Sequence, residues 1–99
     1  MKKYALFKIK EGKKKLWTNW CNELMNRKDE VLLTLQEENL ISERYIILND
    51  YVFGEYEIAE GKEKLPMNKE RELNKKHYEI FHECLEWISD AEAGYEFII

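Results

Sequence analysis

A first strand is predicted from the alternation of side chains near the start of the chain. Residues Tyr4–Lys10 place apolar side chains on both sides of an extended backbone. One face would carry Ala5, Phe7 and Ile9, and the other would carry Tyr4 and Leu6. Glu11 and Gly12 interrupt the alternation, so we expect the strand to end there.

The period then becomes helical. From Lys13 to about Asn39, apolar residues recur every three or four positions, which predicts a helix with one buried face. The polar stretch Asn26–Asp29 separates two runs of this stripe, so the helix is expected to bend or divide there. Asn39 is a residue type that ends helices in the left-handed conformation.

A hairpin is predicted next. Segments Ser42–Leu48 and Tyr51–Ala59 are rich in Tyr, Ile, Val and Phe, and only Asn49 and Asp50 separate them. Both turn residues tolerate positive φ, which favours a tight antiparallel turn. The stretch Glu60–Met67 contains a glycine and the one proline of the chain, and it is predicted to be a loop.

A second helix and a last strand complete the pattern. Asn68 is expected to cap the helix. The helix would bury one stripe of side chains: Leu73, His77, Ile80, Phe81, Cys84, Leu85 and Ile88. Gly94 then allows a turn into a strand over Tyr95–Ile99.

The element order β-α-β-β-α-β predicts the ferredoxin-like α+β fold as one domain over residues 1–99. In this fold a four-stranded antiparallel sheet carries both helices on one face. The other face of such a sheet is usually polar, but the predicted strands are apolar on both sides. A homodimer that packs sheet against sheet would bury the second face. The alternative is that several tyrosines are simply half-exposed, and the pattern leaves open which face would form the dimer.

Charge and composition narrow the function classes. The net charge is −4, although the first 15 residues hold seven lysines and one acid. This balance disfavours a nucleic-acid binder, and lysines on an edge strand explain the basic end. No apolar run approaches the ~20 residues of a membrane span, so we expect a cytoplasmic protein without a membrane partner. Cys21 and Cys84 lack metal-site spacing, and neither a metal nor another cofactor is expected.

Several stretches, taken in order, resemble an uncharacterised bacterial family of the dimeric α+β barrel superfamily. They are Lys8–Lys13, Trp20 with Glu23–Leu32, Leu35–Glu38, the hairpin, and His77–Trp87. This resemblance implies the fold and the dimer, and it implies no reaction. More distantly, Ile41–Leu48 followed by Val52–Glu57 is similar to the hairpin of the rhamnose mutarotases, which are sugar epimerases of the same superfamily.

Six residues are the candidates for chemistry. His77 lies on the apolar stripe of the second helix and is either a general acid or base or a hydrogen-bonded core histidine. Glu55 and Glu57 share a sheet face and are either a proton-transfer pair inside a dimer barrel or solubilising charges at its fringe. The candidate ligand-lining residues are Tyr45, Tyr56 and Tyr95.

These residues support three functional hypotheses. The first is a homodimer of unknown function that binds a small ligand or serves as a scaffold. The second is a cofactor-independent isomerase or epimerase, similar to a mutarotase, in which His77 and a glutamate would transfer protons on a small polar metabolite. The third is a haem- or oxygen-handling enzyme that uses His77.

Overall fold

The computed structural model describes all 99 residues and contains one four-stranded antiparallel sheet with three helices. The elements are β1 (Lys2–Ile9), α1 (Lys14–Asn26), α2 (Lys28–Glu37), β2 (Leu40–Leu48), β3 (Tyr51–Ile58), α3 (Glu72–Cys84) and β4 (Leu85–Ala91). The strand order is β2-β3-β1-β4, so the lysine-rich β1 lies between β3 and β4 and is not the edge strand that its lysines predicted. This is the α+β architecture predicted from the alternating pattern, and it is compatible with the ferredoxin-like arrangement.

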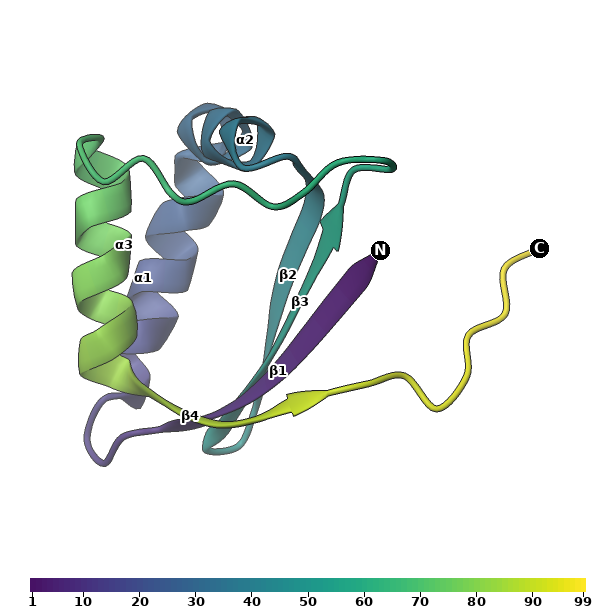
Figure 1. The fold of residues 1–99 in the computed structure, drawn as a ribbon. Helices are drawn as coiled ribbons and strands as arrows, with labels where there is room; N and C mark the ends of the chain where they lie inside the picture. Colours follow the sequence, from purple (N-terminus) through teal and green to yellow (C-terminus); the bar gives the residue numbers. More distant parts are fainter.

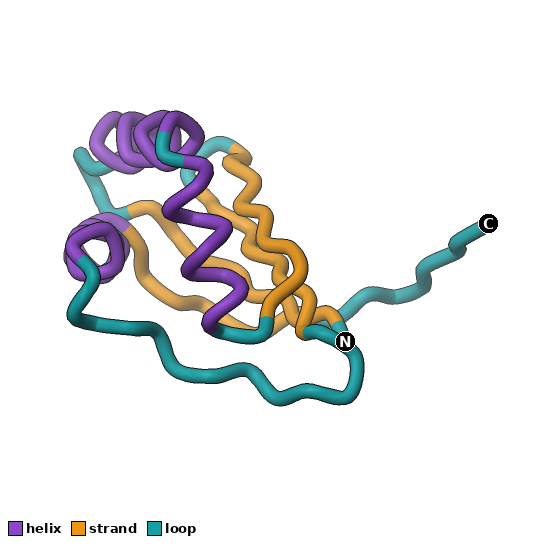
Figure 2. The backbone as a smooth tube through the Cα atoms, turned by 90° about the horizontal axis from the view of Figure 1, so that it is seen from above, coloured by secondary structure: helices purple, strands orange, loops and turns teal.

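The helices cover one face of the sheet and leave the other face bare. Figure 1 shows α1 and α3 side by side against the sheet and α2 across one end, and Figure 2 shows the same layers from above. The core between the layers consists of Phe7, Ile9, Trp17, Trp20, Val52, Leu73, Cys84 and Leu85. None of the helices combines the length and apolar character needed to cross a membrane.

The predicted helix over residues 13–39 divides at Arg27, inside the polar stretch. Arg27 has φ −116° and ψ 40°, which lies outside the helical region and turns α2 away from α1. The two asparagines expected to tolerate positive φ do adopt it: Asn39 has φ 62° after α2, and Asn49 has φ 54° in the hairpin turn. These local predictions are confirmed.

The end of the chain differs from its prediction. Helix α3 stops at Cys84, and β4 begins at once with Leu85, so Ile88 belongs to a strand. The register pairs Leu85 with Ile9 and Ser89 with Leu6, with an irregularity between Leu6 and Phe7. Pairing with the free edge of β1 outweighs the helical spacing of these residues. The predicted strand Tyr95–Ile99 is therefore wrong, and this segment is a tail without regular structure.

The register also separates the two faces of the sheet. Pairs such as Phe7–Val52 and Ala5–Gly54 point toward the helices, whereas Leu6–Phe53 points to the open side. Gly54 leaves room for Tyr45, because a Cβ built on Gly54 would lie 3.0 Å from two ring carbons of Tyr45. The absence of a side chain at Gly54 therefore sets the position of the Tyr45 ring.

We predict that Gly54→Ala destabilises the fold by about 1–3 kcal/mol, because the added methyl group must displace a packed aromatic ring. Gly94→Ala is the matched control, since nothing lies within 4 Å of a Cβ at Gly94. Urea unfolding followed by circular dichroism measures both variants. Equal stability of the two variants would contradict the close contact at Gly54.

Candidate functional site

The space between the helices and the sheet contains cavities around Tyr45. The Tyr45 ring lies 6.0 Å from the ring of Phe81 and 6.2 Å from that of Trp17, measured between centroids. Tyr45 lines three cavities, with volumes of ≈ 580, ≈ 210 and ≈ 400 Å³. The two smaller ones also share His77 and Glu43, and they lie between α1, α2, α3 and β2. The polar groups of β2 and α3 therefore converge on one region.

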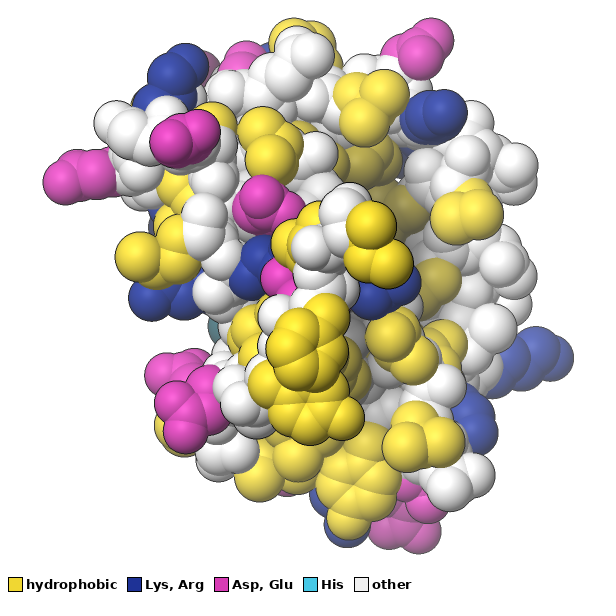
Figure 3. All heavy atoms as spheres, turned by 90° about the vertical axis from the view of Figure 1, so that its right-hand side faces the viewer, with side chains coloured by type: hydrophobic (Ala, Val, Ile, Leu, Met, Phe, Trp, Pro, Cys, Tyr) yellow, Lys and Arg dark blue, Asp and Glu magenta, His cyan; other side chains and the backbone are white.

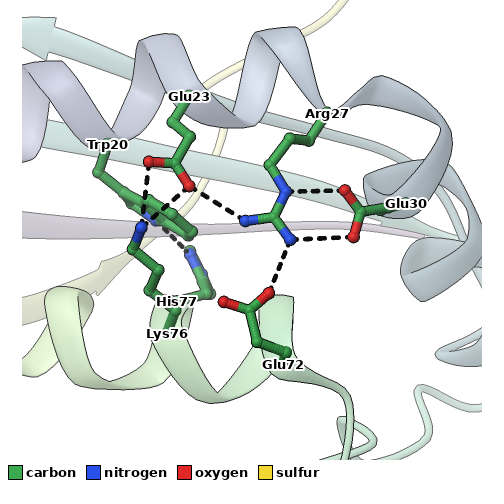
Figure 4. A network of polar contacts seen from close by, with 7 residues as sticks. All are labelled: Trp20, Glu23, Arg27, Glu30, Glu72, Lys76 and His77. Carbon is green, nitrogen blue, oxygen red and sulfur yellow. Dashed lines mark hydrogen bonds and ion pairs between the residues drawn. The ribbon is translucent and has the colours of Figure 1, made fainter.

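His77 is held by a single hydrogen bond from α1. Trp20 is 2% exposed and donates its indole N–H to Nδ1 of His77 at 2.9 Å (Figure 4). A neutral imidazole that accepts at Nδ1 carries its proton on Nε2. Burial, with a smaller contribution from His82, lowers the pKa of His77 to about 4. His77 is therefore neutral at physiological pH, and its Nε2–H has no partner within the chain.

An ion network braces this bond from outside. The guanidinium of Arg27, at the break between α1 and α2, contacts Glu23, Glu30 and Glu72, with distances of 3.0, 2.7 and 2.8 Å (Figure 4). These partners raise the pKa of Arg27, chiefly through the hydrogen bonds to Glu30 and Glu72. Lys76, the neighbour of His77, pairs with Glu23 at 3.1 Å and lies over the Trp20 ring. The three helices are thus joined around the imidazole.

Glu43 is the carboxylate that lines both smaller cavities with His77, and Glu38 and Lys64 also line the ≈ 210 Å³ cavity. The residue is exposed on the edge strand β2, lines both of these cavities and has no ion pair. Burial raises its pKa to about 7, the charge of Glu38 adds to the rise, and Lys64 opposes it. Glu43 therefore changes protonation near neutral pH.

The cavity walls combine these groups with apolar surface. The ≈ 400 Å³ cavity is lined mainly by hydrophobic side chains, among them Trp17, Cys21, Leu24, Met25, Val31 and Leu32. The indole N–H of Trp17 is buried without an acceptor. The ≈ 210 Å³ cavity is more polar and includes Thr34 and Asn74, which are bonded to each other at 3.0 Å. Such a site can hold an apolar body and offer hydrogen-bond donors to one acceptor.

Three of the residues predicted from the sequence are brought together. His77 lines both smaller cavities, Tyr45 lines all three, and Tyr56 lines the ≈ 580 and ≈ 210 Å³ cavities. Tyr95 lies on the C-terminal tail, is 81% exposed and lines none of them.

The two predicted carboxylates lie on the opposite side of the sheet from His77. Glu55 faces the open side, where it pairs with Arg44 at 3.1 Å and with Lys2 at 3.7 Å. Glu57 pairs in register with Ser42 and Lys2 on that same face. The carboxylate that accompanies His77 is Glu43, which the sequence reasoning missed. The alternation that placed Tyr45 and Ile47 on one face extends back to Glu43, and this was the available signal.

The two cysteines and the second histidine lie in surroundings that give them no role in the candidate site. Cys21 and Cys84 are free thiols, and burial raises the pKa of both, which keeps them protonated. His82 is exposed and its ring is tilted against that of Tyr78, with 4.3 Å between the ring centroids. No group of three His, Cys, Asp or Glu side chains has an arrangement that could hold a metal ion.

Comparison with known proteins gives a family and no activity. The model of a family of unknown function (DUF6176) matches residues 3–99. A search of curated proteins finds no match. Because the family model covers nearly the whole length, the chain belongs to this family of unknown function, DUF6176.

Proposed function

We propose that this protein binds a small, largely apolar ligand that carries a hydrogen-bond-accepting oxygen. The ligand would occupy the cavities between the helices and β2, with its oxygen directed to His77 Nε2. The observation that carries this proposal is the Trp20–His77 bond at 2.9 Å, because it fixes the imidazole as a neutral N–H donor beside a cavity. Nε2 is not among the buried polar atoms that lack a partner, and His77 lines the cavity wall, so an acceptor atom of a ligand can reach it.

Glu43 extends the recognition of that oxygen. Below a pH of about 7 its carboxyl group is protonated and can donate a second hydrogen bond. The ring of Tyr45 and the side chains of Leu24 and Val31 provide apolar contact for the rest of the ligand. A carboxylate or carbonyl compound with one aromatic or branched aliphatic group fits these features.

A second candidate function is a cofactor-independent isomerase or epimerase, and the raised pKa of Glu43 favours it. A carboxyl group that titrates near neutral pH can both accept and return a proton. Glu43 replaces Glu55 and Glu57 in this hypothesis, and His77 would stabilise a developing oxyanion through Nε2–H instead of acting as the base. The resemblance to rhamnose mutarotases that we inferred from the hairpin sequence makes a sugar the first substrate to test.

We also propose that the functional form is a homodimer of the α+β barrel type, joined through the open sheet faces. Two rows of paired residues on that face are largely apolar: Ile46, Phe53 and Leu6, then Leu48, Tyr51 and Lys8. Figure 3 looks onto this side and shows apolar side chains spread between charged ones.

The exposed area supports this association. The chain exposes 7425 Å², whereas a compact monomer of 12.1 kDa exposes roughly 6,000 Å². The difference is larger than the roughly 800 Å² that each partner buries in a standard interface. Each subunit would keep its own ligand cavity on the helix side, away from the interface.

The binding proposal predicts that phenylacetate binds near millimolar concentration at pH 6 and quenches the fluorescence of Trp17 and Trp20. His77→Leu should weaken binding roughly tenfold, because one hydrogen bond of about 1.4 kcal/mol is lost. Binding should also weaken as the pH rises through about 7, where Glu43 loses its proton and becomes a like charge. Glu43→Gln should abolish this pH dependence.

Benzylamine, which has no acceptor oxygen, is the control ligand. Equal binding of phenylacetate to wild type and His77→Leu would overturn the proposal.

The isomerase candidate predicts exchange between the anomers of L-rhamnose, measured by saturation transfer in ¹H NMR. The rate should rise as the pH passes about 7, because the Glu43 carboxylate is then available as a base. Glu43→Gln should remove the exchange, whereas Glu57→Gln, on the other sheet face, should not. Absence of exchange with the wild type removes the mutarotase hypothesis.

A further inference from the structure

We propose that the C-terminal segment, residues 92–99, is an arm that packs onto the open sheet face of a second copy of the chain. This inference rests on the proposed face-to-face dimer and adds a set of contacts to it. The arm follows β4 and ends in the run Tyr95–Ile99.

The arm carries apolar side chains that have almost no contacts within their own chain. Tyr95, Phe97, Ile98 and Ile99 are 81%, 86%, 83% and 125% exposed. The rings of Tyr95 and Phe97 contact each other, with 5.2 Å between their centroids. A contiguous exposed patch of this kind in a soluble protein marks an interaction site.

The arm lies on the bare side of the sheet. Figure 1 shows it leaving β4 and running away from the helices, on the side that no helix covers. Lys2 fixes the arm at one point, since its Nζ donates to the Glu96 carboxylate at 2.9 Å. Lys2 lies at the polar end of the open face, where it pairs in register with Glu57. The apolar rows lie farther along β1, at Leu6 and Lys8.

The arm leaves the apolar rows of its own chain uncovered. Its side chains Tyr95, Phe97 and Ile98 are 81%, 86% and 83% exposed, and Leu48 and Tyr51 of the second row are 66% and 42% exposed. Both surfaces are therefore exposed in a single copy.

A second copy of the chain would cover both the exposed arm and the exposed apolar rows of the open sheet face. In a two-fold dimer each copy donates one arm and receives one, so every exposed apolar run has an apolar face opposite it. Tyr, Phe and Ile are the residue types that pack well on a sheet surface, and alternation places Tyr95, Phe97 and Ile99 on one side of an extended arm. The arm is thus suited to lie across strands of the partner.

Sedimentation equilibrium of the full-length protein tests the energetic part of the proposal. The double variant Phe97→Ser, Ile99→Ser should raise the dimer dissociation constant at least tenfold. Met25→Ser is the matched control, because Met25 is also 80% exposed but lies on α1, on the helix side. A double variant that dimerises as tightly as the wild type would contradict the proposal that the arm packs onto the second copy.

Cysteine cross-linking tests the location of the arm. Phe97→Cys and Ile46→Cys, carried on separate chains, should form a disulfide between chains when mixed and oxidised. A disulfide that forms only when both cysteines are on one chain would show that the arm folds back, and it would overturn the proposal while leaving the dimer intact.

The variant Phe53→Glu tests the dimer itself. A wild type that is monomeric at micromolar concentration, with Phe53→Glu unchanged from it, would overturn both the dimer and the arm, whereas ligand binding on the helix side would be unaffected.

Discussion

Trp20 and His77 meet where α1 packs against α3, and their hydrogen bond fixes the chemistry of the cavity. The indole can only donate, so Nδ1 of His77 must accept and the proton must remain on Nε2. Burial keeps the ring neutral. The ion pairs Lys76–Glu23 and Arg27–Glu72 hold α1 and α3 together around this bond. The imidazole is consequently a donor on a rigid support, which is how a binding site obtains directionality from few polar groups.

The two faces of the sheet carry different sets of residues. The helix side holds the cavity groups Glu43, Tyr45 and His77, and Gly54 makes room for the Tyr45 ring. The open side combines a polar end around Glu55 with two apolar rows. The ligand and the second copy that we propose would therefore not compete for surface. The separation also explains why Glu55 and Glu57 have no connection with the imidazole.

Much of the fold could be predicted because strong local signals agree with the tertiary structure. The alternation of β1, the turn at Asn49 and the break near Arg27 all depend on residues close in sequence. The end of α3 could not be predicted in this way, because Leu85 and Ile88 continue the helical stripe and only pairing with β1 selects a strand. The proximity of His77, Tyr45 and Tyr56 could be predicted, because each is a polar side chain at the apolar spacing of its helix or strand and therefore faces the layer between the helices and the sheet. Glu43 was missed because its surroundings come from α2 and the loop that carries Lys64, which are distant in sequence.

The protonation state of His77 is the central claim, and long-range ¹H–¹⁵N NMR of the imidazole measures it directly. We expect Nδ1 to show the shift of an unprotonated nitrogen bonded to a donor, Nε2 to carry the proton, and the ring to remain neutral until the pH falls to about 4. Trp20→Phe should remove the preference for this tautomer. A ring that titrates near 6.5, or one that carries its proton on Nδ1, would contradict the account.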